Sequence, residues 1–576
     1  MEKQKIIDAL NEIADWLEIK GENSFKCNAY RTAARTLEVF DGDFSKLIEE
    51  DKLAELKGIG KSLAEKITTL TKTDTLPLLE ELRSIFPNSL LELLKIPGVG
   101  PKKVKTVFEK FDIKTVGELE YACNENRLVE LPGFGLKTQE KILKGIELYK
   151  RSAGRFLVDV VSSSSERLLN SLKNLKEVNS LEVAGSLRRA RETVKDIDIL
   201  VASKKPEPIM KAFVLQPKIA QITNQGETKS SIVLEEGISA DLRVVSPQEF
   251  PFALNYFTGS KEHNVALRSR AIKMGFKLNE YGLFKIEDDK ETLLKCKNEK
   301  EIYKALGLAY IPPELREDRG EIEAAEKNKI PELVSDKDVL GIFHIHTDYS
   351  DGIFTLRNAV EIAKSLGLIY IGVSDHSQTA AYANGLKPDK VKQQWEEIDK
   401  LNEEIGDFKI FKGIESDILV NGALDYDENL LSGFDFVIGS VHSHFNMKEK
   451  EMTDRIIRAL ENPYITMLGH PTGRLLLARD GYPVDMDAII ETSAKNNVIL
   501  EINANPYRLD LDWRYCRKAI EKGIILSINP DTHRREGFEH TKYGVGVARK
   551  GWCEKHHILN TRTADEVLNI FKKKKS

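Results

Sequence analysis

The chain has 576 residues, of which 41% are hydrophobic and 31% are charged, and its formal net charge is −5. This is the composition of an ordinary folded chain, and at about 150 residues per domain its length indicates about four domains. No apolar run reaches the roughly 18 residues that a membrane-spanning helix needs. The small acidic excess gives no sign of a nucleic-acid partner, although a total can conceal local basic patches.

The start of the chain and its cysteines indicate a reduced compartment. Residues 1–20 form an amphipathic pattern with acids throughout, whereas a secretory signal peptide has a basic start and an unbroken apolar core. The five cysteines are scattered and include no Cys-x-x-Cys pair, which argues against a disulfide framework and a zinc finger. We therefore expect a cytoplasmic protein that does not associate with a membrane.

Residues 1–150 are expected to be entirely helical, because apolar residues recur at intervals of three and four. A short repeat interrupts these helices three times, as LKGIGKSLAEKI (56–67), IPGVGPKKVKTV (96–107) and LPGFGLKTQEKI (131–142). Each copy has an apolar residue, then Gly-x-Gly, then a lysine-rich helix pattern. Such a turn presents free N–H groups at a helix N-terminus, where a phosphate is stabilised.

One copy of this repeat is explained as well by a corner between two helices. Three copies with the same apolar frame resemble helix-hairpin-helix motifs, and the resemblance implies contact with the DNA backbone without sequence readout. The glycines that would make this contact are Gly58, Gly60, Gly98, Gly100, Gly133 and Gly135.

From about residue 155 short β-type runs begin, and a pair of acids occurs in GSLRRARETVKDIDILV (185–201). In a strand Asp196 and Asp198 point to the same face, where two carboxylates repel each other unless a cation lies between them. Mg²⁺ takes carboxylate oxygens and substrate phosphates, and Asp241 in ISADLRVV is a candidate third ligand. The alternative is a pair of solvated strand acids. The apolar run that follows, and the Gly-Ser turn and arginines that precede, favour a triphosphate site.

This region resembles the nucleotidyltransferase palm of family X DNA polymerases, the group that includes DNA polymerase beta. NYFTGSKEHNVALRSRAIKMGFKLNEYGLF (255–284) resembles that family's nucleotide-binding segment. The resemblance implies an α+β palm and thumb in which Asp196, Asp198 and Asp241 hold two Mg²⁺ or Mn²⁺ ions for attack by the primer 3′ oxygen. The residues that it implies for nucleotide binding are Gly185, Ser186, Arg189, Tyr256, Phe257, Gly259, Asn264 and Arg268.

The N-terminal segments NAYRTAARTL (28–37) and GIGKSLAEKI (58–67) resemble the small lyase domain of the same family. Lys66 occupies the position of that family's Schiff-base lysine, and a lysine nucleophile attacks the C1′ aldehyde of an abasic 5′ deoxyribose phosphate. A surface lysine that binds phosphate is the alternative. The resemblance therefore makes Lys66 a candidate catalytic residue.

After a highly charged, proline-bounded stretch (313–335), β-type runs alternate with amphipathic helices, a pattern typical of barrel-like architectures. In GIFHIHTDYSDG (341–352), His344 and His346 face the same way in a strand, so both can reach one metal. Further histidines and acids end successive β-type runs, and ligands at the C-terminal ends of barrel strands meet on one face. The candidate ligands at these positions are His344, His346, Asp375, His376, Glu415, His442, His470, Asp531 and His533.

This set resembles the ligands of the PHP domain, which is named for polymerase and histidinol phosphatase. The nine ligands that the resemblance implies are His344, His346, Asp351, His376, Glu415, His442, His470, Asp531 and His533. The resemblance implies a distorted (β/α)7 barrel with a phosphoester-hydrolysing centre of up to three ions. Mn²⁺ and Zn²⁺ suit mixed histidine and carboxylate ligands better than Mg²⁺ does. His444 and Asp348 lie outside the pattern, and we expect them around the centre or at the surface.

The resemblance covers nearly the whole chain. It implies a gap-filling DNA polymerase of base excision repair with a Mn²⁺-dependent 3′→5′ exonuclease, to which abasic endonuclease or 3′-phosphatase activity could be added. Gapped or primed DNA and dNTPs are the expected partners of a monomer. Two alternatives stay open: a barrel that hydrolyses a small phosphomonoester, and a DNA-binding scaffold with an idle polymerase site. The expected parts are a lyase-like helical domain (1–80), fingers (81–150), a palm (151–248), a thumb (249–316), a charged linker (317–335) and the PHP domain (336–576).

Overall fold

The computed structural model describes residues 3–575 except 39, 41–43, 57, 74, 130, 151–153 and 289. The chain divides into two compact units, Met1–Lys150 and Arg151–Ser576. Among the described residues, none of the helices is both long and apolar enough to cross a membrane.

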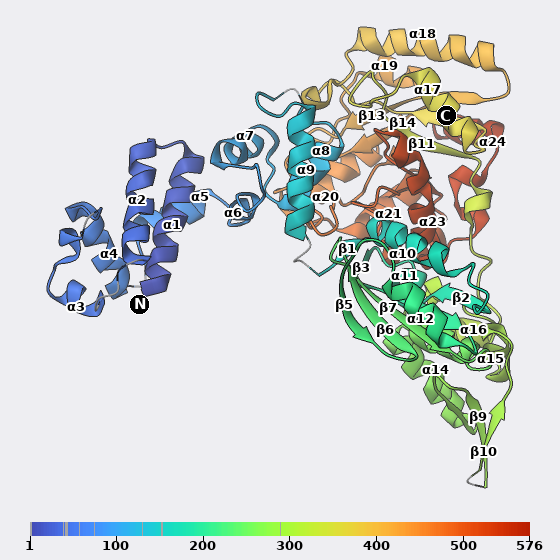
Figure 1. The fold of residues 1–576 in the computed structure, drawn as a ribbon. Coiled ribbons are helices and arrows are strands. Elements are labelled where there is room, and N and C mark those ends of the chain that lie inside the picture. The colour runs from blue at the N-terminus through green and yellow to red at the C-terminus, as the bar shows by residue number, and fades with distance from the viewer. Residues whose placement is uncertain are drawn as a thin grey trace. The chain divides into compact units, whose positions relative to one another are not determined.

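The described part of the first unit contains helices and no strand, as its periodicity predicts (Figure 1). Trp16 stacks on Phe86 with ring centroids 5.5 Å apart, and Phe86 meets Phe108 edge-on at 6.0 Å. These rings link α1 (Lys3–Lys20), the residue that follows α5 (Pro77–Ile85) and α7 (Pro101–Phe111) in one apolar core. The helices are α1 (Lys3–Lys20), α2 (Ser24–Glu38), α3 (Phe44–Glu49), η1 (Leu53–Glu55), α4 (Lys61–Thr73), α5 (Pro77–Ile85), α6 (Ser89–Leu93), α7 (Pro101–Phe111), α8 (Val116–Asn124) and α9 (Leu136–Lys150).

The second unit begins with a five-stranded sheet, here called the palm sheet, in the order β2-β4-β7-β6-β5. Its central strands β4 and β7 are parallel, and its other pairs are antiparallel. Side chains of α10 (Val158–Leu172) and α12 (Pro206–Val214) pack on its apolar face. Its strands are β2 (Ser180–Val183), β4 (Asp196–Ala202), β5 (Ile219–Gln225), β6 (Lys229–Leu234) and β7 (Ser239–Val245).

A smaller helical and antiparallel region follows the palm sheet. The buried Glu299 carboxylate joins it to the palm, because Glu299 Oε2 lies 2.7 Å from Arg188 Nη2 and Oε1 lies 2.6 Å from Arg316 Nη1. Arg316 is completely buried, so this ion pair is shielded from water. The elements are α13 (Phe250–Thr258), α14 (Lys261–Lys273), β8 (Phe276–Leu278), β9 (Leu283–Glu287), β10 (Lys290–Leu294) and α15 (Glu299–Ala305).

The stretch 317–335, which we expected to be a charged linker, contains ordered structure with buried charged residues. It contains the short helix α16 (Glu321–Glu326), and both Glu321 and its partner His263 are fully buried. The carboxylate of Glu321 lies 2.7 Å from His263 Nδ1 and accepts hydrogen bonds from the backbone N–H groups of Asp318 and Arg319. The acids that suggested a solvated linker are therefore partly used in packing this stretch against the rest of the unit.

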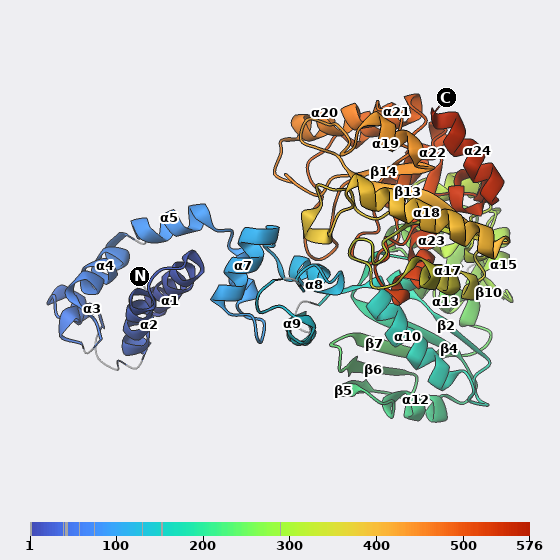
Figure 2. The ribbon, with the colours of Figure 1, turned by 90° about the horizontal axis from the view of Figure 1, so that it is seen from above.

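The remainder of the chain forms the expected distorted (β/α)7 barrel (Figure 2). Seven parallel strands pair in sequential order, and a parallel bridge from Ile345 to Thr532 brings the first strand to the segment after the last. The strand residues are almost all buried, as expected for a parallel sheet covered by helices. The strands are β11 (Gly341–Ile345), β12 (Tyr370–Val373), β13 (Lys409–Asp417), β14 (Phe436–Ser440), β15 (Met467–Leu468), β16 (Ile499–Asn503) and β17 (Leu526–Asn529).

Amphipathic helices alternate with these strands. The last of them packs Phe571 against Phe343, Phe411 and Phe436, with ring centroids 5.5–5.9 Å apart, and so covers part of the barrel core. The helices are α17 (Leu356–Ser365), α18 (Pro388–Ile405), α19 (Glu428–Gly433), α20 (Glu449–Leu460), α21 (Met486–Lys495), α22 (Trp513–Glu521), α23 (Thr541–Lys550) and α24 (Ala564–Lys575).

Replacing Glu299 by glutamine is expected to destabilise the second unit by about 3 kcal/mol at pH 7, because it leaves the buried Arg316 and the partly buried Arg188 without their counter-charge. Burial would raise the pKa of Glu299, but Arg316 and Arg188 lower it to about 2, below the ordinary value of 4.5. A carboxylate with a depressed folded-state pKa stabilises above its unfolded pKa and loses this contribution as the pH falls. The difference between wild type and Glu299→Gln should therefore shrink by about 1 kcal/mol between pH 7 and 4. Urea unfolding at both pH values measures it, and a pH-independent difference would contradict the assignment.

Candidate metal centres and DNA-binding hairpins

The three palm aspartates are brought together by strand register. In the parallel pair β4–β7, Asp198 lies directly opposite Asp241. Asp196 stands two residues before Asp198 on the same face of β4, while Ile197 and Ile199 point into the core. Lys229 Nζ lies 2.9 Å from Asp241 Oδ2. Three carboxylates thus share one face of the palm sheet with one lysine beside them.

Electrostatics at this face favour a cation. Burial and the negative charges of Asp196 and Asp241 raise the pKa of Asp198 to about 6. The donor atoms are all carboxylate oxygens, which hard divalent cations prefer. The residues present therefore fit a divalent metal site.

The turn before β4 approaches Asp198 closely. Gly185 has φ +64°, and a Cβ added there would lie 2.3 Å from Asp198 Oδ2, so only glycine fits. Gly185 and Ser186 begin the short helix α11 (Gly185–Arg188), and Arg189 follows it. Arg189 Nε donates to Glu317 Oε1 at 3.1 Å, and its Nη1 donates to the carbonyl of Thr258.

The other predicted nucleotide-binding residues lie at the junction of α13 and α14. The rings of Tyr256 and Phe257 meet edge-on at 5.2 Å. Asn264 Nδ2 donates to the Tyr256 carbonyl at 2.7 Å, and Arg268 Nε donates to the Asn264 carbonyl at 3.2 Å. A Cβ added at Gly259 would lie 2.9 Å from Arg189 Nη1, which brings this junction next to the turn before β4.

All nine barrel ligands that the resemblance implies converge in one buried cluster, here called the barrel centre. Glu415 on β13 is its hub. Its Oε1 lies 3.0–3.2 Å from the Nε2 atoms of His344, His442 and His470, and its Oε2 lies 2.9 Å from His376 Nδ1. Glu415 therefore faces histidines that follow or end four other strands.

The remaining ligands complete this cluster. Asp531 Oδ1 lies 3.2 Å from His346 Nε2 and 3.4 Å from His344 Nε2. Asp351 Oδ1 lies 3.3 Å from His533 Nε2, and its Oδ2 lies 3.6 Å from His376 Nε2. Four overlapping groups within the cluster have ligand atoms close enough to share one ion. Together these groups include all nine residues.

Unmet hydrogen-bonding capacity supports metal binding at the barrel centre. Among the described residues, the Nε2 atoms of His344, His346 and His376 are buried and make no hydrogen bond of acceptable geometry, although carboxylate oxygens lie 3.1–3.6 Å from them. Burying polar atoms without a partner is costly, and a bound cation would satisfy them. The donor set of imidazole nitrogens and carboxylate oxygens fits first-row divalent ions.

The protonation of the centre is suited to ligation. Burial, together with nearby cationic groups, lowers the pKa of His346 to about 3 and that of His470 to about 4, so both rings are neutral at pH 7. Burial opposes the charged form of Glu415, but His442, His344 and His376 outweigh it and hold the pKa of Glu415 well below its ordinary value.

Two acids that the sequence analysis missed hold the ligands in place. Glu501 on β16 lies 2.6 Å from His344 Nδ1 and accepts a hydrogen bond from the backbone N–H of His470. Asp417 lies 2.5 Å from His442 Nδ1. Such partners orient a ligating imidazole. For Glu501 the sequence did contain a signal, because this acid interrupts the otherwise apolar strand pattern VILEIN (498–503).

Two other residues of the ligand-rich segments lie outside the centre. Asp348 and His444 are exposed, in agreement with a surface position. Asp375, a candidate ligand in the sequence, is buried but belongs to none of the ligand groups. It accepts hydrogen bonds from Thr347 and Gln394 instead, so it braces the loop that carries the first ligands.

The three glycine hairpins in the first unit share one geometry. In each, the residue between the glycines donates its N–H to the apolar residue three positions earlier, at 3.0 Å. The carbonyl of the second glycine then accepts from the third and fourth residues of the next helix. Gly98 and Gly133 have φ of +87° and +86°, and a Cβ at either would meet nothing, so the backbone angle alone requires glycine. The three copies therefore repeat in structure as well as in amino-acid sequence. Their turns lie at Gly58–Gly60, Gly98–Gly100 and Gly133–Gly135.

Lys66 lies on α4, directly after the first hairpin. Its Nζ donates to the Tyr30 hydroxyl at 2.7 Å and lies 5.2 Å from the centre of the Tyr30 ring. The side chain is half-buried, so the amine is held in a defined position.

Comparison with known proteins covers the whole chain. Family models match a helix-hairpin-helix domain (residues 1–76), a SAM-like helix-hairpin-helix tandem (90–147), a DNA polymerase beta thumb (253–317) and a PHP domain (343–505). The chain is 38% identical over 575 residues to the DNA polymerase/3′-5′ exonuclease PolX of Bacillus subtilis, with 100% of each chain covered.

Two further relatives match shorter parts of the chain. A repair DNA polymerase X of African swine fever virus is 32% identical over 24% of this chain and 81% of its own. A probable phosphatase of Clostridium acetobutylicum is 29% identical over 33% of this chain and 77% of its own. With the full-length match and the two domain models, these findings show that the chain belongs to the family X DNA polymerases that carry a PHP domain.

Proposed function

We propose that the chain is a DNA-directed DNA polymerase that fills short gaps in base excision repair, and that its barrel shortens DNA as a metal-dependent 3′→5′ exonuclease. The observation that carries the proposal is the presence of two different ligand sets in one unit. One has three carboxylates on β4 and β7, and the other has nine histidines and carboxylates at the barrel centre. The name of the full-length Bacillus subtilis relative supports the same pair of activities.

In the palm, Asp196, Asp198 and Asp241 would hold two Mg²⁺ or Mn²⁺ ions. Such ions stabilise the charge that develops on the attacking primer oxygen and the leaving pyrophosphate. The chain itself binds and orients the substrates.

The nucleotide pocket proposed here uses the turn before β4 and the α13–α14 junction. Gly185 and Ser186 offer backbone and hydroxyl donors, and Arg189 offers a guanidinium for the triphosphate. The remaining contacts are assigned to the sugar and the nascent base pair, and they are Tyr256, Phe257, Gly259, Asn264 and Arg268.

At the barrel centre, the nine ligands would hold up to three ions, with Mn²⁺ and Zn²⁺ suited to the mixed donors. Ions held by these residues would polarise a phosphoester and would supply a nucleophile near neutral pH. Glu501 and Asp417 keep His344 and His442 turned toward the centre. The buried setting excludes bulk water from the ligand atoms.

The first unit is assigned to DNA backbone binding through its six hairpin glycines, so gapped or primed DNA is the polymeric partner of a monomer. Lys66 is assigned a lyase role, because its amine is fixed against Tyr30 beside a hairpin. Borohydride trapping of the chain on DNA with a 5′ deoxyribose phosphate tests this assignment, and the absence of a trapped adduct would rule it out.

A small-molecule phosphatase is the second candidate for the barrel. The likeness to the probable phosphatase of Clostridium acetobutylicum, which spans a third of this chain, favours it. The helix-hairpin-helix matches favour DNA as the substrate instead, because hydrolysis of a small phosphomonoester does not need a domain that binds the DNA backbone.

Replacing Asp198 or Asp241 by asparagine should lower gap filling by about 10³-fold, because each change removes a metal ligand and several kcal/mol of charge stabilisation. The assay extends a 5′-labelled primer on one-nucleotide-gapped DNA with Mg²⁺ and dNTPs. Shortening of the same primer with Mn²⁺ and no dNTP should persist. Glu182→Gln, an exposed acid on the neighbouring strand β2, is the matched control. Extension at the wild-type rate by both asparagine variants would refute the palm assignment.

Replacing Glu415 by glutamine should abolish primer shortening and reduce the Mn²⁺ or Zn²⁺ that co-purifies with the chain, because this carboxylate faces five histidines. Elemental analysis gives the metal content independently of activity. Glu403→Gln, an exposed acid on α18, should change neither quantity. Hydrolysis of nitrophenyl phosphate that exceeds shortening of DNA in wild type would favour the phosphatase. Shortening that persists in Glu415→Gln would place the nuclease elsewhere.

A further inference from the structure

A lysine of the barrel reaches the nucleotide side of the palm. Lys550 ends helix α23, and its side chain is completely buried. Its ammonium group donates to Glu317 Oε1 at 2.5 Å, to the Arg189 carbonyl at 3.0 Å and to the Glu314 carbonyl at 3.4 Å. The three acceptors belong to the palm (Arg189), the end of the thumb (Glu314) and the stretch that follows the thumb (Glu317).

Glu317 connects this lysine with Arg189. The same oxygen that binds Lys550 accepts from Arg189 Nε at 3.1 Å, and Glu317 Oε2 lies 3.5 Å from Arg191 Nη1. Burial opposes ionisation of Glu317, but Lys550, Arg189 and Arg191 outweigh it and lower the pKa of the carboxyl. One carboxylate therefore serves three cations.

The Arg189 guanidinium is fixed on two sides. Glu317 holds Nε, and the Thr258 carbonyl holds Nη1 beside Gly259. Only 14% of the side chain is exposed, so its direction is set by these partners. A change in the charge or position of Glu317 would therefore alter the orientation of the Arg189 guanidinium directly.

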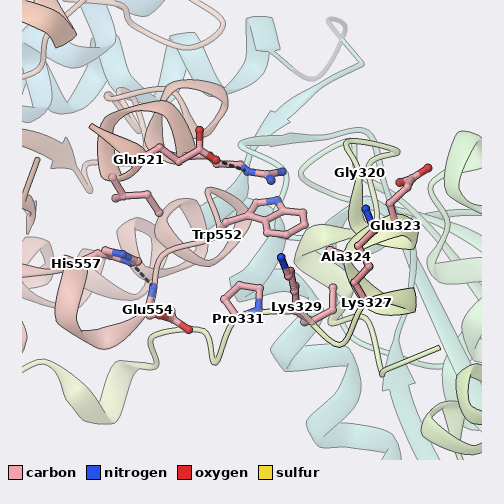
Figure 3. A pocket seen from close by; sticks show the side chains of 13 residues that line it. Gly320, Glu323, Ala324, Lys327, Lys329, Pro331, Glu521, Trp552, Glu554 and His557 are labelled. Atoms are coloured by element: carbon pink, nitrogen blue, oxygen red, sulfur yellow. Dashed lines mark hydrogen bonds and ion pairs between the residues drawn. The ribbon is translucent and has the colours of Figure 1, made fainter. Parts of the chain in front are cut away.

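The contact around Lys550 is local. Next to it, Gly546 of α23 packs on Ala190, and Arg549 Nε lies 2.7 Å from Glu314 Oε1. Farther along, the boundary between α16 and the barrel opens into a cavity of about 740 Å³ beside Trp552, with Gly320 and Glu323 on one side and Glu521 and Glu554 on the other (Figure 3). The palm and the barrel also meet elsewhere, where Arg474 Nη2 lies 3.6 Å from Glu192 Oε1, and the cluster at Lys550 is a contact that adjoins Arg189.

We propose that Lys550 is a positioning residue for the polymerase reaction: it offsets the charge of Glu317, so that this carboxylate orients Arg189 without cancelling its attraction for the incoming triphosphate. The proposal rests on the function assigned to Arg189 above. Lys550, Arg189 and Arg191 against Glu317 leave two net positive charges in the cluster, and removal of the lysine leaves one. The barrel thus contributes to nucleotide binding without supplying a metal ligand to the palm.

The test is Lys550→Met in the full chain, with kcat and the KM for dNTP measured on one-nucleotide-gapped DNA with Mg²⁺. We expect the KM for dNTP to rise about tenfold, within the range typical of coupling between sites. kcat, the Kd for gapped DNA and primer shortening with Mn²⁺ should stay within about twofold of wild type. Lys542→Met, an exposed lysine on the same helix, should leave the KM for dNTP unchanged.

A charge-restoring variant separates positioning from packing. Lys550→Met/Glu317→Gln returns the cluster to two net positive charges and keeps an amide oxygen for Arg189, so the KM should return toward the wild-type value. If the single variant does not fold, Lys550→Gln takes its place, since glutamine keeps hydrogen-bond donors and loses the charge.

Two results would overturn the proposal. The first is an unchanged KM for dNTP in a folded Lys550 variant. The second is a rise in the KM for dNTP that is accompanied by losses of DNA affinity and thermal stability and that the double variant does not reverse. Arg189→Met distinguishes failure of the underlying function: an unchanged KM in that variant would remove Arg189 from the nucleotide site whatever Lys550 does.

Discussion

Parallel strand pairing is the constraint on which both candidate metal centres depend. In the palm sheet it places Asp198 of β4 opposite Asp241 of β7, although 43 residues separate them in the sequence. In the barrel it brings the C-terminal ends of seven strands to one side, where nine ligands meet. The cost of collecting buried carboxylates and imidazoles in this way is offset when a cation shares them, and the same cation supplies the chemistry.

Buried ion pairs then determine how the parts of the second unit meet. Glu299 joins two arginines across the palm and the thumb, and Glu317 joins the palm to the last residue of α23. A buried charge that loses its partner is strongly destabilising, so these contacts favour one arrangement over others. They also connect Lys550 of the barrel to Arg189 of the proposed triphosphate site through the single carboxylate of Glu317.

Much of the candidate chemistry was predictable because it follows short-range rules. Side chains alternate along a strand, which placed Asp196 and Asp198 on one face. The three glycine repeats predicted three equivalent turns. The packing of 317–335 was not predictable, because composition does not reveal that Glu321 pairs with His263 some 58 residues earlier. Glu501 and Asp417 were missed for the same reason: their importance comes from the histidines that they face, which lie on other strands. Long-range partners of single acids are set by the fold, and one sequence does not display them.

The central claim is that one unit holds two separate metal centres. Anomalous diffraction at the manganese edge, from crystals of the full chain grown with Mn²⁺, gapped DNA and a non-hydrolysable dNTP, tests it most directly. The account predicts two distinct groups of peaks, one bound by Asp196, Asp198 and Asp241 and the other by the nine residues around Glu415. A single group, or peaks bound by neither ligand set, would contradict it.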